Sequence, residues 1–142
     1  LVALHEAVRA LRGGEVGRAL VGAIHIMCEP TNTLAYYNAG MLSKGGCCRT
    51  FDSGADGYAR SEGGAMLLLR PLADALRDGD SVHAVIKGTA TNHGGRAAGL
   101  TVPNPERQAQ LIQDAWHDAG LDLKSVSYFE AHGTGTPLDN MY

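Results

Sequence analysis

The stretch EAHGTGTP, residues 130–137, is the most informative part of the 142-residue sequence. It continues a short apolar run, residues 126–131, that is typical of a buried strand. His132 therefore stands where a strand is expected to end, and in layered α/β proteins strand ends open toward ligand-binding crevices. A neutral imidazole at such a place can donate a hydrogen bond to a developing oxyanion or enolate.

The residues after His132 suit a tight turn around a ligand. Gly133 and Gly135 permit a sharp turn and the close approach of another molecule. Thr134 and Thr136 offer two hydroxyls to a polar, chain-like ligand. From the residues alone, two other interpretations stay open: a histidine that merely caps a strand, or a phosphate-cradling loop. The phosphate loop is disfavoured because the lysine of a P-loop is missing.

Outward from this motif, apolar residues at helical spacing alternate with short apolar runs. The sequence predicts strands over residues 19–27, 64–70, 82–91 and 126–131, and helices over residues 1–11, 31–41 and 71–77. A fourth helix is expected to begin at Pro105, after Asn104 as its N-cap, and to end at Gly120. Residues 43–64 and 92–103 are expected to be loops, the first of a length typical of functional loops. This alternation predicts an α/β domain with a layered core.

The composition is that of an ordinary globular protein, with 44% hydrophobic residues, 19% charged residues and a net charge of −3. Because no basic stripe is present, nucleic-acid binding has little support. The longest apolar run, residues 20–27, is too short to cross a bilayer, so we expect a cytoplasmic protein with no membrane partner. Cys28, Cys47 and Cys48 lack the spacing of a metal site and are expected to be buried or free thiols in a reducing cytosol.

The longer string EAHGTGTPL, residues 130–138, resembles the first histidine motif of the β-ketoacyl synthases in the thiolase superfamily. Four further stretches resemble ketosynthase segments in the family's own order: residues 1–23 (LVALHEAVRALRGGEVGRALVGA), Leu42-Ser43 with residues 48–52 (CRTFD), residues 56–63 (DGYARSEG) and residues 87–104 (KGTATNHGGRAAGLTVPN). Together they cover nearly the whole chain. The NHGGR form of the last stretch, which contains His93, is similar to ketosynthases of trans-acyltransferase polyketide assembly lines.

The resemblance implies a partial thiolase-like layered α/β fold, in which residues 1–142 are one incomplete ketosynthase domain cut at both ends. The chain would span the late N-terminal half and the early C-terminal half of that domain. The family's nucleophilic cysteine would lie just before Leu1, and its second catalytic histidine beyond Tyr142. We therefore expect the chain to be inactive by itself and its strands to expose apolar surface.

The function implied is that of a 3-oxoacyl-[acyl-carrier-protein] synthase in polyketide biosynthesis. Such an acyltransferase joins a malonyl-type extender to an enzyme-bound acyl chain in a decarboxylative Claisen condensation. His132 matches the family's first catalytic histidine, and Thr134 and Thr136 match threonines that contact the phosphopantetheine arm of an acyl carrier protein. The resemblance implies no directly bound cofactor and no metal, with the carrier protein as partner and a homodimer as the intact domain. A fatty-acid condensing enzyme and a non-condensing docking or gating domain are the alternatives.

Several other residues have plain structural interpretations. Cys47 and Cys48 are expected to be inert, and Trp116 to pack in the core. Glu62 is expected either to support the active site through hydrogen bonds or to form an ion pair with Arg60 or another arginine. The remaining histidines are expected to be structural, in helices, strands or a surface turn: His5, His25, His83, His93 and His117. Residues 139–142 depart from the "PLGDPIE" continuation that the family usually shows.

Overall fold

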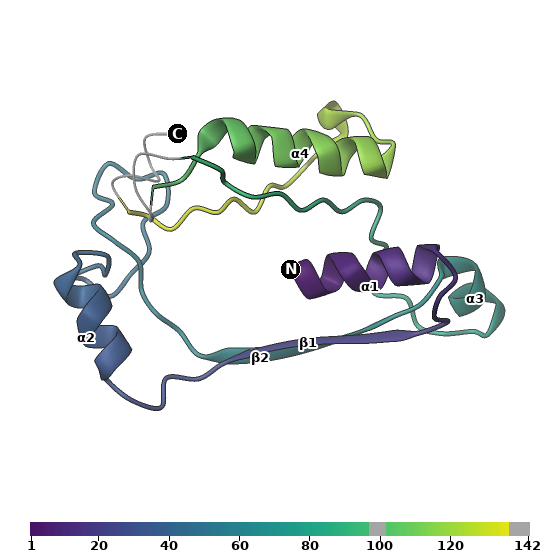
Figure 1. Cartoon of the computed structure of the whole chain (residues 1–142), viewed down its shortest axis with the longest axis horizontal. Coiled ribbons are helices and arrows are strands. Elements are labelled where there is room, and N and C mark those ends of the chain that lie inside the picture. Colours follow the sequence, from purple (N-terminus) through teal and green to yellow (C-terminus); the bar gives the residue numbers. More distant parts are fainter. Residues whose placement is uncertain (97–101, 137–142) are drawn as a thin grey trace. The chain divides into compact units, whose positions relative to one another are not determined.

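The computed structural model describes residues 1–96 and 102–136 (Figure 1). Its elements, in chain order, are α1 (Val2–Arg12), β1 (Ala19–His25), α2 (Thr31–Asn38), β2 (Gly63–Leu69), α3 (Leu72–Arg77), α4 (Pro105–Ala119) and the 3-10 helix η1 (Leu123–Ser125). All four predicted helices and the first two predicted strands are confirmed, with bounds that shift by three residues or fewer.

Helix α4 shows how local sequence sets the ends of an element. It begins at Pro105, whose fixed φ suits the first helical position, and it ends before Gly120, which has a φ of 61°. The side-chain amide of Asn104 donates hydrogen bonds to the carbonyl oxygens of Gly94 and Arg96, at 3.0 and 3.2 Å. Asn104 therefore braces the loop that precedes the helix.

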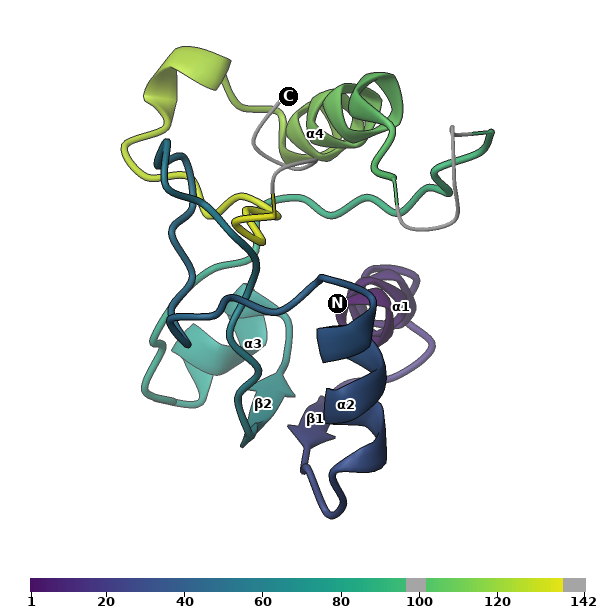
Figure 2. The same ribbon diagram turned by 90° about the vertical axis from the view of Figure 1, so that its left-hand side faces the viewer.

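Strands β1 and β2 form a two-stranded sheet, with α1 alongside it (Figures 1 and 2). Gly22 lies beside Met66 and Gly64 lies beside Ile24, so residue numbers rise in one strand as they fall in the other and the strands run antiparallel. The sheet leaves several large apolar side chains exposed, among them Leu20, Ile24, Met66 and Leu68. The expectation that these strands expose apolar surface is confirmed.

The two remaining strand predictions, over residues 82–91 and 126–131, are wrong for this chain. Neither segment forms a strand in the part of the chain that the structure describes. A strand exists through its ladder of hydrogen bonds to a neighbour, which an apolar run cannot supply by itself. Around residues 87–89 the polar backbone groups are bound by side chains of helices instead.

The chain divides into two compact units, and the first consists of Leu1–Ile24, Gly64–His93 and Glu106–Ser125. It holds α1, α3, most of the sheet and most of α4. Val8 and Ala75 are its buried apolar side chains within the described residues, at 7% and 5% exposure. A core this small follows from the exposed faces of β1 and β2.

Asp118, in the last turn of α4, is the centre of a polar cluster in the first unit. Its carboxylate accepts hydrogen bonds from Arg12 Nη1, at 2.8 and 2.9 Å, and from the Thr89 N–H, at 2.8 Å. The Thr89 N–H and then the Arg12 guanidinium hold the pKa of Asp118 below its ordinary value of 3.8. Arg12 also donates to the Lys87 carbonyl at 2.8 Å, and His5 is hydrogen-bonded to the Thr89 hydroxyl at 2.8 Å. The cluster thus joins α1, residues 87–89 and α4.

The second unit consists of His25–Gly63, Gly94–Pro105 and Val126–Tyr142, of which residues 97–101 and 137–142 lie outside the described residues. It holds α2, the long loop that follows it and the turn that contains His132. Arg60 lies over the ring of Tyr36, 5.3 Å from its centroid, and donates a hydrogen bond to the Thr33 hydroxyl. These contacts hold the loop against α2.

Candidate active site

The segment after His132 forms the tight turn that its glycines predict. Gly133 has a φ of 46° and Gly135 a φ of 73°, in the left-handed region that residues with a side chain rarely adopt. A side chain at Gly133 would overlap Thr50, because its Cβ would lie 2.6 Å from Thr50 Cγ2. We predicted that a ligand would approach the backbone closely here. At Gly133 it is instead the loop containing Thr50 that makes this close approach.

Thr50, in the long loop, holds the first carbonyl of the turn. Its hydroxyl donates a hydrogen bond of 2.5 Å to the carbonyl oxygen of Gly133, and this bond is partly buried. Gly133 directly follows His132, so the bond holds the Gly133–Thr134 peptide, one residue beyond the histidine. This hydrogen bond spans 83 positions of the sequence and would not be evident from either segment alone.

Gly57 holds the second carbonyl of the turn through its backbone. Its N–H donates a hydrogen bond of 3.0 Å to the carbonyl oxygen of Gly135. Gly57 has a φ of 139°, and a Cβ there would lie 2.5 Å from backbone atoms of both Leu42 and Ser43. Leu42 also forms an isolated parallel bridge with Tyr58. The loop thus closes on itself at the residue that holds the turn.

Side chains brace the loop between its two donors. Asp52 accepts a hydrogen bond of 2.6 Å from the Gly54 N–H, and Asp56 accepts one of 3.2 Å from the Lys44 N–H. The Ser43 hydroxyl lies near the Asp56 carboxylate without the geometry of a full hydrogen bond, and it is the largest influence that lowers the Asp56 pKa. The Lys44 N–H adds to this effect. An ionised Asp56 therefore suits the folded loop.

The structure brings the hydroxyls of Thr134 and Thr136 together. Their hydroxyl oxygens are 3.1 Å apart, and the Thr136 N–H donates to Thr134 Oγ1 at 3.4 Å. Both residues are half-buried on the same turn. The structure therefore presents two neighbouring hydroxyls close to His132, and their role in binding a substrate arm stays a prediction.

His132 itself is exposed, so its imidazole is accessible to a ligand. Two residues earlier, Glu130 accepts a hydrogen bond of 2.5 Å from the Tyr128 hydroxyl, and the carboxylate raises the pKa of that tyrosine. An accessible imidazole on a braced turn can donate a hydrogen bond to an oxygen that gains negative charge. The catalytic role of His132 stays a prediction.

Cys28, Cys47 and Cys48 are exposed free thiols. The prediction of free thiols is therefore confirmed, and the prediction that they are buried is wrong. Cys48 Sγ accepts a hydrogen bond from the Ala59 N–H at 3.2 Å.

Glu62 accepts a hydrogen bond of 2.6 Å from the Met27 N–H, and Arg60 contacts Thr33 and Tyr36 instead of Glu62. Glu62 therefore supports the chain next to β1.

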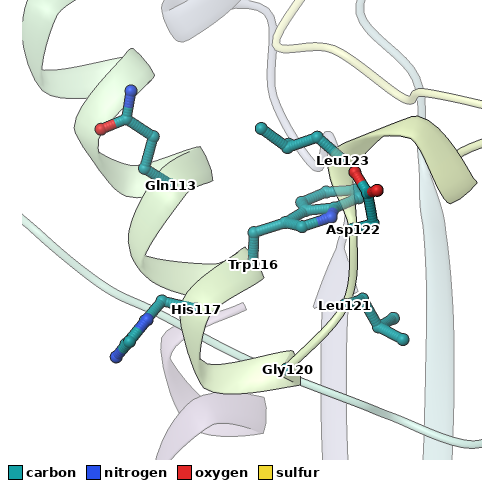
Figure 3. A pocket seen from close by; sticks show the side chains of 7 residues that line it. All are labelled: Gln113, Trp116, His117, Gly120, Leu121, Asp122 and Leu123. Atoms are coloured by element: carbon teal, nitrogen blue, oxygen red, sulfur yellow. The ribbon is translucent and has the colours of Figure 1, made fainter.

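Trp116 lies at the C-terminal end of α4, half-buried rather than in a closed core (Figure 3). Together with His117, Leu121 and Leu123 it lines a shallow hollow. Its indole nitrogen is shielded from solvent and has no hydrogen-bond partner among the described residues. Packing against the following turn, rather than chemistry, accounts for this residue.

Thr50, Gly57 and Asp56 are the site residues that the sequence did not single out. Two signals pointed to their segments: the length of the glycine-rich loop, residues 43–64, and the likeness of residues 48–52 and 56–63 to ketosynthase motifs. Within residues 1–96 and 102–136, no group of three or more His, Cys, Asp or Glu side chains is placed to hold a metal ion. The helices of this same part of the chain are too short or too polar to span a bilayer.

Comparison with solved structures places the fold. The chain superposes on the oxazolomycin ketosynthase domain OzmH KS7 of Streptomyces albus JA3453 with a TM-score of 0.94 and 44% identity, over 99% of this chain and 24% of that one. It superposes on the ketosynthase from module 6 of the bacillaene synthase of Bacillus subtilis 168 with a TM-score of 0.92 and 39% identity. This match covers 96% of this chain and 25% of that one. The predicted partial thiolase-like α/β fold is confirmed.

Sequence relatives point the same way. The chain is 50% identical over 138 residues to the polyketide synthase PksN of Bacillus subtilis, covering 97% of this chain and 2% of that protein. It is 48% identical over 136 residues to the partially reducing polyketide synthase men1 of Menisporopsis theobromae, covering 96% of this chain and 5% of that protein. The chain therefore spans a small part of these relatives and about a quarter of the solved ketosynthase chains.

Two family models divide the chain between them. "Beta-ketoacyl synthase, N-terminal domain" matches residues 1–75, and "Beta-ketoacyl synthase, C-terminal domain" matches residues 83–141. The histidine motif lies in the second match and the bracing loop in the first. With these matches, the chain belongs to the β-ketoacyl synthase family.

Proposed function

We propose that this chain supplies part of the active site of a 3-oxoacyl-[acyl-carrier-protein] synthase that acts in polyketide biosynthesis. The observation that carries the proposal is the turn at His132. Thr50 and Gly57 hold the carbonyls of Gly133 and Gly135 in the turn after the histidine, while the imidazole stays exposed. A fixed and accessible histidine, in the family's histidine motif, suits a group that stabilises developing negative charge.

In the proposed reaction, an acyl chain first forms a thioester with a cysteine, and a malonyl thioester then enters on its carrier. The bond between the malonyl carboxylate and the adjacent carbon breaks, CO2 leaves, and the electron pair of that bond forms an enolate. A neutral His132 imidazole donates a hydrogen bond to the enolate oxygen. The enolate carbon attacks the acyl carbon, the cysteine thiolate leaves, and the chain is two carbons longer.

Thr134 and Thr136 are the proposed contacts for the phosphopantetheine arm. Two hydroxyls 3.1 Å apart can serve the amide groups of such an arm as donors and acceptors. The acyl carrier protein is therefore the proposed partner, and the substrates arrive on its arm rather than on a cofactor of this chain. A cytoplasmic homodimer is the proposed form of the intact domain.

The nucleophile of the reaction comes from the family resemblance, which places a cysteine just before Leu1. That position is the N-terminal end of α1. The partial positive charge of a helix N-terminus lowers the pKa of a thiol and favours the reactive thiolate. The chain supplies His132 alone of the family's Cys-His-His set, so we propose that it needs the other two residues for activity.

The names of the relatives favour a polyketide synthase over the two alternatives, a fatty-acid condensing enzyme and a non-condensing docking or gating domain. The sequence around His93 supports the narrower proposal of a trans-acyltransferase assembly line.

The test is a single-turnover condensation with an intact ketosynthase domain that contains this chain. The domain is charged with an acyl group and mixed with malonyl-loaded carrier protein, and the carrier is analysed by mass spectrometry. A 3-oxoacyl group on the carrier is the expected product. A domain that accepts the acyl group and returns it unextended would instead support the docking or gating alternative.

A further inference from the structure

Thr50 makes two different contacts with Gly133, the residue that follows His132. Its hydroxyl donates a partly buried hydrogen bond of 2.5 Å to the Gly133 carbonyl oxygen. Its methyl group lies against Gly133, where an added Cβ would come within 2.6 Å of it. One side chain thus fixes the orientation of the peptide plane and also limits how far the turn can move toward the loop.

We propose that Thr50 is a positioning residue for His132, an inference that rests on the proposed function. The orientation of the Gly133 carbonyl is set by the backbone torsions of Gly133, the residue joined to the C-terminal side of His132, so holding this carbonyl restricts the backbone that carries the histidine. Without the hydroxyl, that oxygen must find water or turn away, because a shielded carbonyl that loses its partner is unfavourable. Gly133 has no side chain to resist such a rotation, and its φ of 46° is one of several that glycine adopts easily.

A second contact between the loop and the turn does not involve Thr50, so the effect of Thr50 on His132 can be measured apart from the attachment of the turn to the loop. The hydrogen bond from the Gly57 N–H to the Gly135 carbonyl is made by backbone atoms alone. It therefore survives any substitution at Thr50 and keeps the turn attached to the loop. Loss of the Thr50 hydroxyl frees the end of the turn that carries His132 and leaves the end near Thr136 in place.

The loop that presents Thr50 is itself well held. The Asp52 N–H donates to the Arg49 carbonyl at 3.2 Å, and the Ala55 N–H donates to the Asp52 carbonyl at 3.1 Å. The first of these turns contains Thr50 and the second follows it, and both are closed by backbone atoms without the Thr50 side chain. A substitution that changes the side chain alone therefore leaves the backbone donor set of the loop intact.

The test uses an intact ketosynthase domain that contains this chain, with Thr50→Val, Thr50→Ser and Thr50→Ala. Thr50→Val keeps the shape and removes the hydroxyl, Thr50→Ser keeps the hydroxyl and removes the methyl, and Thr50→Ala is a second variant without a hydroxyl. For each variant, acylation of the domain and decarboxylation of malonyl-carrier protein are measured separately, together with Tm. The ratio of the two rates reports the position of His132, because acylation does not use the histidine.

We expect Thr50→Val and Thr50→Ala to lower decarboxylation about tenfold to a hundredfold, as a displaced catalytic group does, while acylation stays within about twofold. Thr50→Ser should keep the wild-type ratio. Equal losses in both rates, or a serine variant as impaired as the valine variant, would overturn the positioning role. Should Thr50→Val fail to fold, the comparison of serine with alanine decides the question.

His132→Ala in the same assays separates this inference from the proposed function. Suppressed decarboxylation in His132→Ala with an unchanged ratio in Thr50→Val refutes the positioning role alone. Unchanged decarboxylation in His132→Ala refutes the proposed function and this inference with it.

Discussion

The backbone N–H of Gly57 donates a hydrogen bond of 3.0 Å to the carbonyl oxygen of Gly135, and it does so from a conformation that glycine alone adopts readily, with a φ of 139°. Gly135 follows Thr134, so this bond and the one from Thr50 hold the carbonyls on either side of that threonine. The site is therefore built from two distant segments that each need a glycine.

Gly57→Ala should destabilise the intact ketosynthase domain by roughly 3 kcal/mol or more, since it adds backbone strain to a severe overlap. The new Cβ would lie 2.5 Å from backbone atoms of Leu42 and Ser43, which cannot move aside as a flexible side chain can. Urea unfolding measures the change. Gly94→Ala is the control, because among the described residues no atom beyond its chain neighbours lies within 4 Å of a Cβ there, and it should cost less than about 1 kcal/mol. Similar losses for both variants would contradict the packing described at Gly57.

Asp118 should make the domain lose stability in acid. Its pKa is lowered in the folded state by the Thr89 N–H and by Arg12, so its contribution is fully present above the unfolded pKa of about 4 and is lost as pH falls through the lower folded value. The free energy of unfolding of wild type and Asp118→Asn is compared between pH 3 and pH 7. The difference between them should be constant above about pH 5 and shrink below about pH 4.

An exposed ion pair provides the control for that measurement. Arg9 and Glu6 are 3.3 Å apart on α1, with side chains that are 68% and 59% exposed. Glu6→Gln should change stability by less than about 0.5 kcal/mol, because such pairs are weak in water. A difference between wild type and Asp118→Asn that grows toward low pH would contradict the cluster around Asp118.

Thr134→Val and Thr136→Val should weaken the use of carrier-bound substrates. Each removes one of two hydroxyls that are 3.1 Å apart, and we expect KM for malonyl-carrier protein to rise about fivefold to tenfold, the effect of one lost hydrogen bond. Steady-state kinetics measure KM and kcat. Thr31→Val, which removes an exposed hydroxyl at the start of α2, should leave KM unchanged. An unchanged KM in both site variants would contradict the proposed contact with the arm.

Much of the fold could be predicted from the sequence, because the signals were local. Pro105 and Gly120 mark the two ends of α4, and the apolar runs at Ala19–His25 and Gly63–Leu69 mark two strands. Residues 82–91 and 126–131 have the same apolar character but form no strand within the described chain. Strand formation depends on a neighbouring strand, and no local pattern reveals whether one is available.

The sequence predicted the functional groups of the site but not the hydrogen bonds that hold them in place. The motif from His132 to Thr136 names the imidazole and both hydroxyls, and the positive φ angles of Gly133 and Gly135 were expected from a turn. The hydrogen bond from Thr50 was not, because it joins residues 83 positions apart. A threonine in a glycine-rich loop looks like any surface threonine until the fold brings its partner to it.

The most direct test of the central claim is decarboxylation of malonyl-carrier protein by the intact ketosynthase domain carrying His132→Ala. We expect the variant to be acylated at close to the wild-type rate, while decarboxylation falls by about two to three orders of magnitude, the usual cost of removing one such donor. Decarboxylation at the wild-type rate in a correctly folded His132→Ala domain would contradict the proposed role of His132.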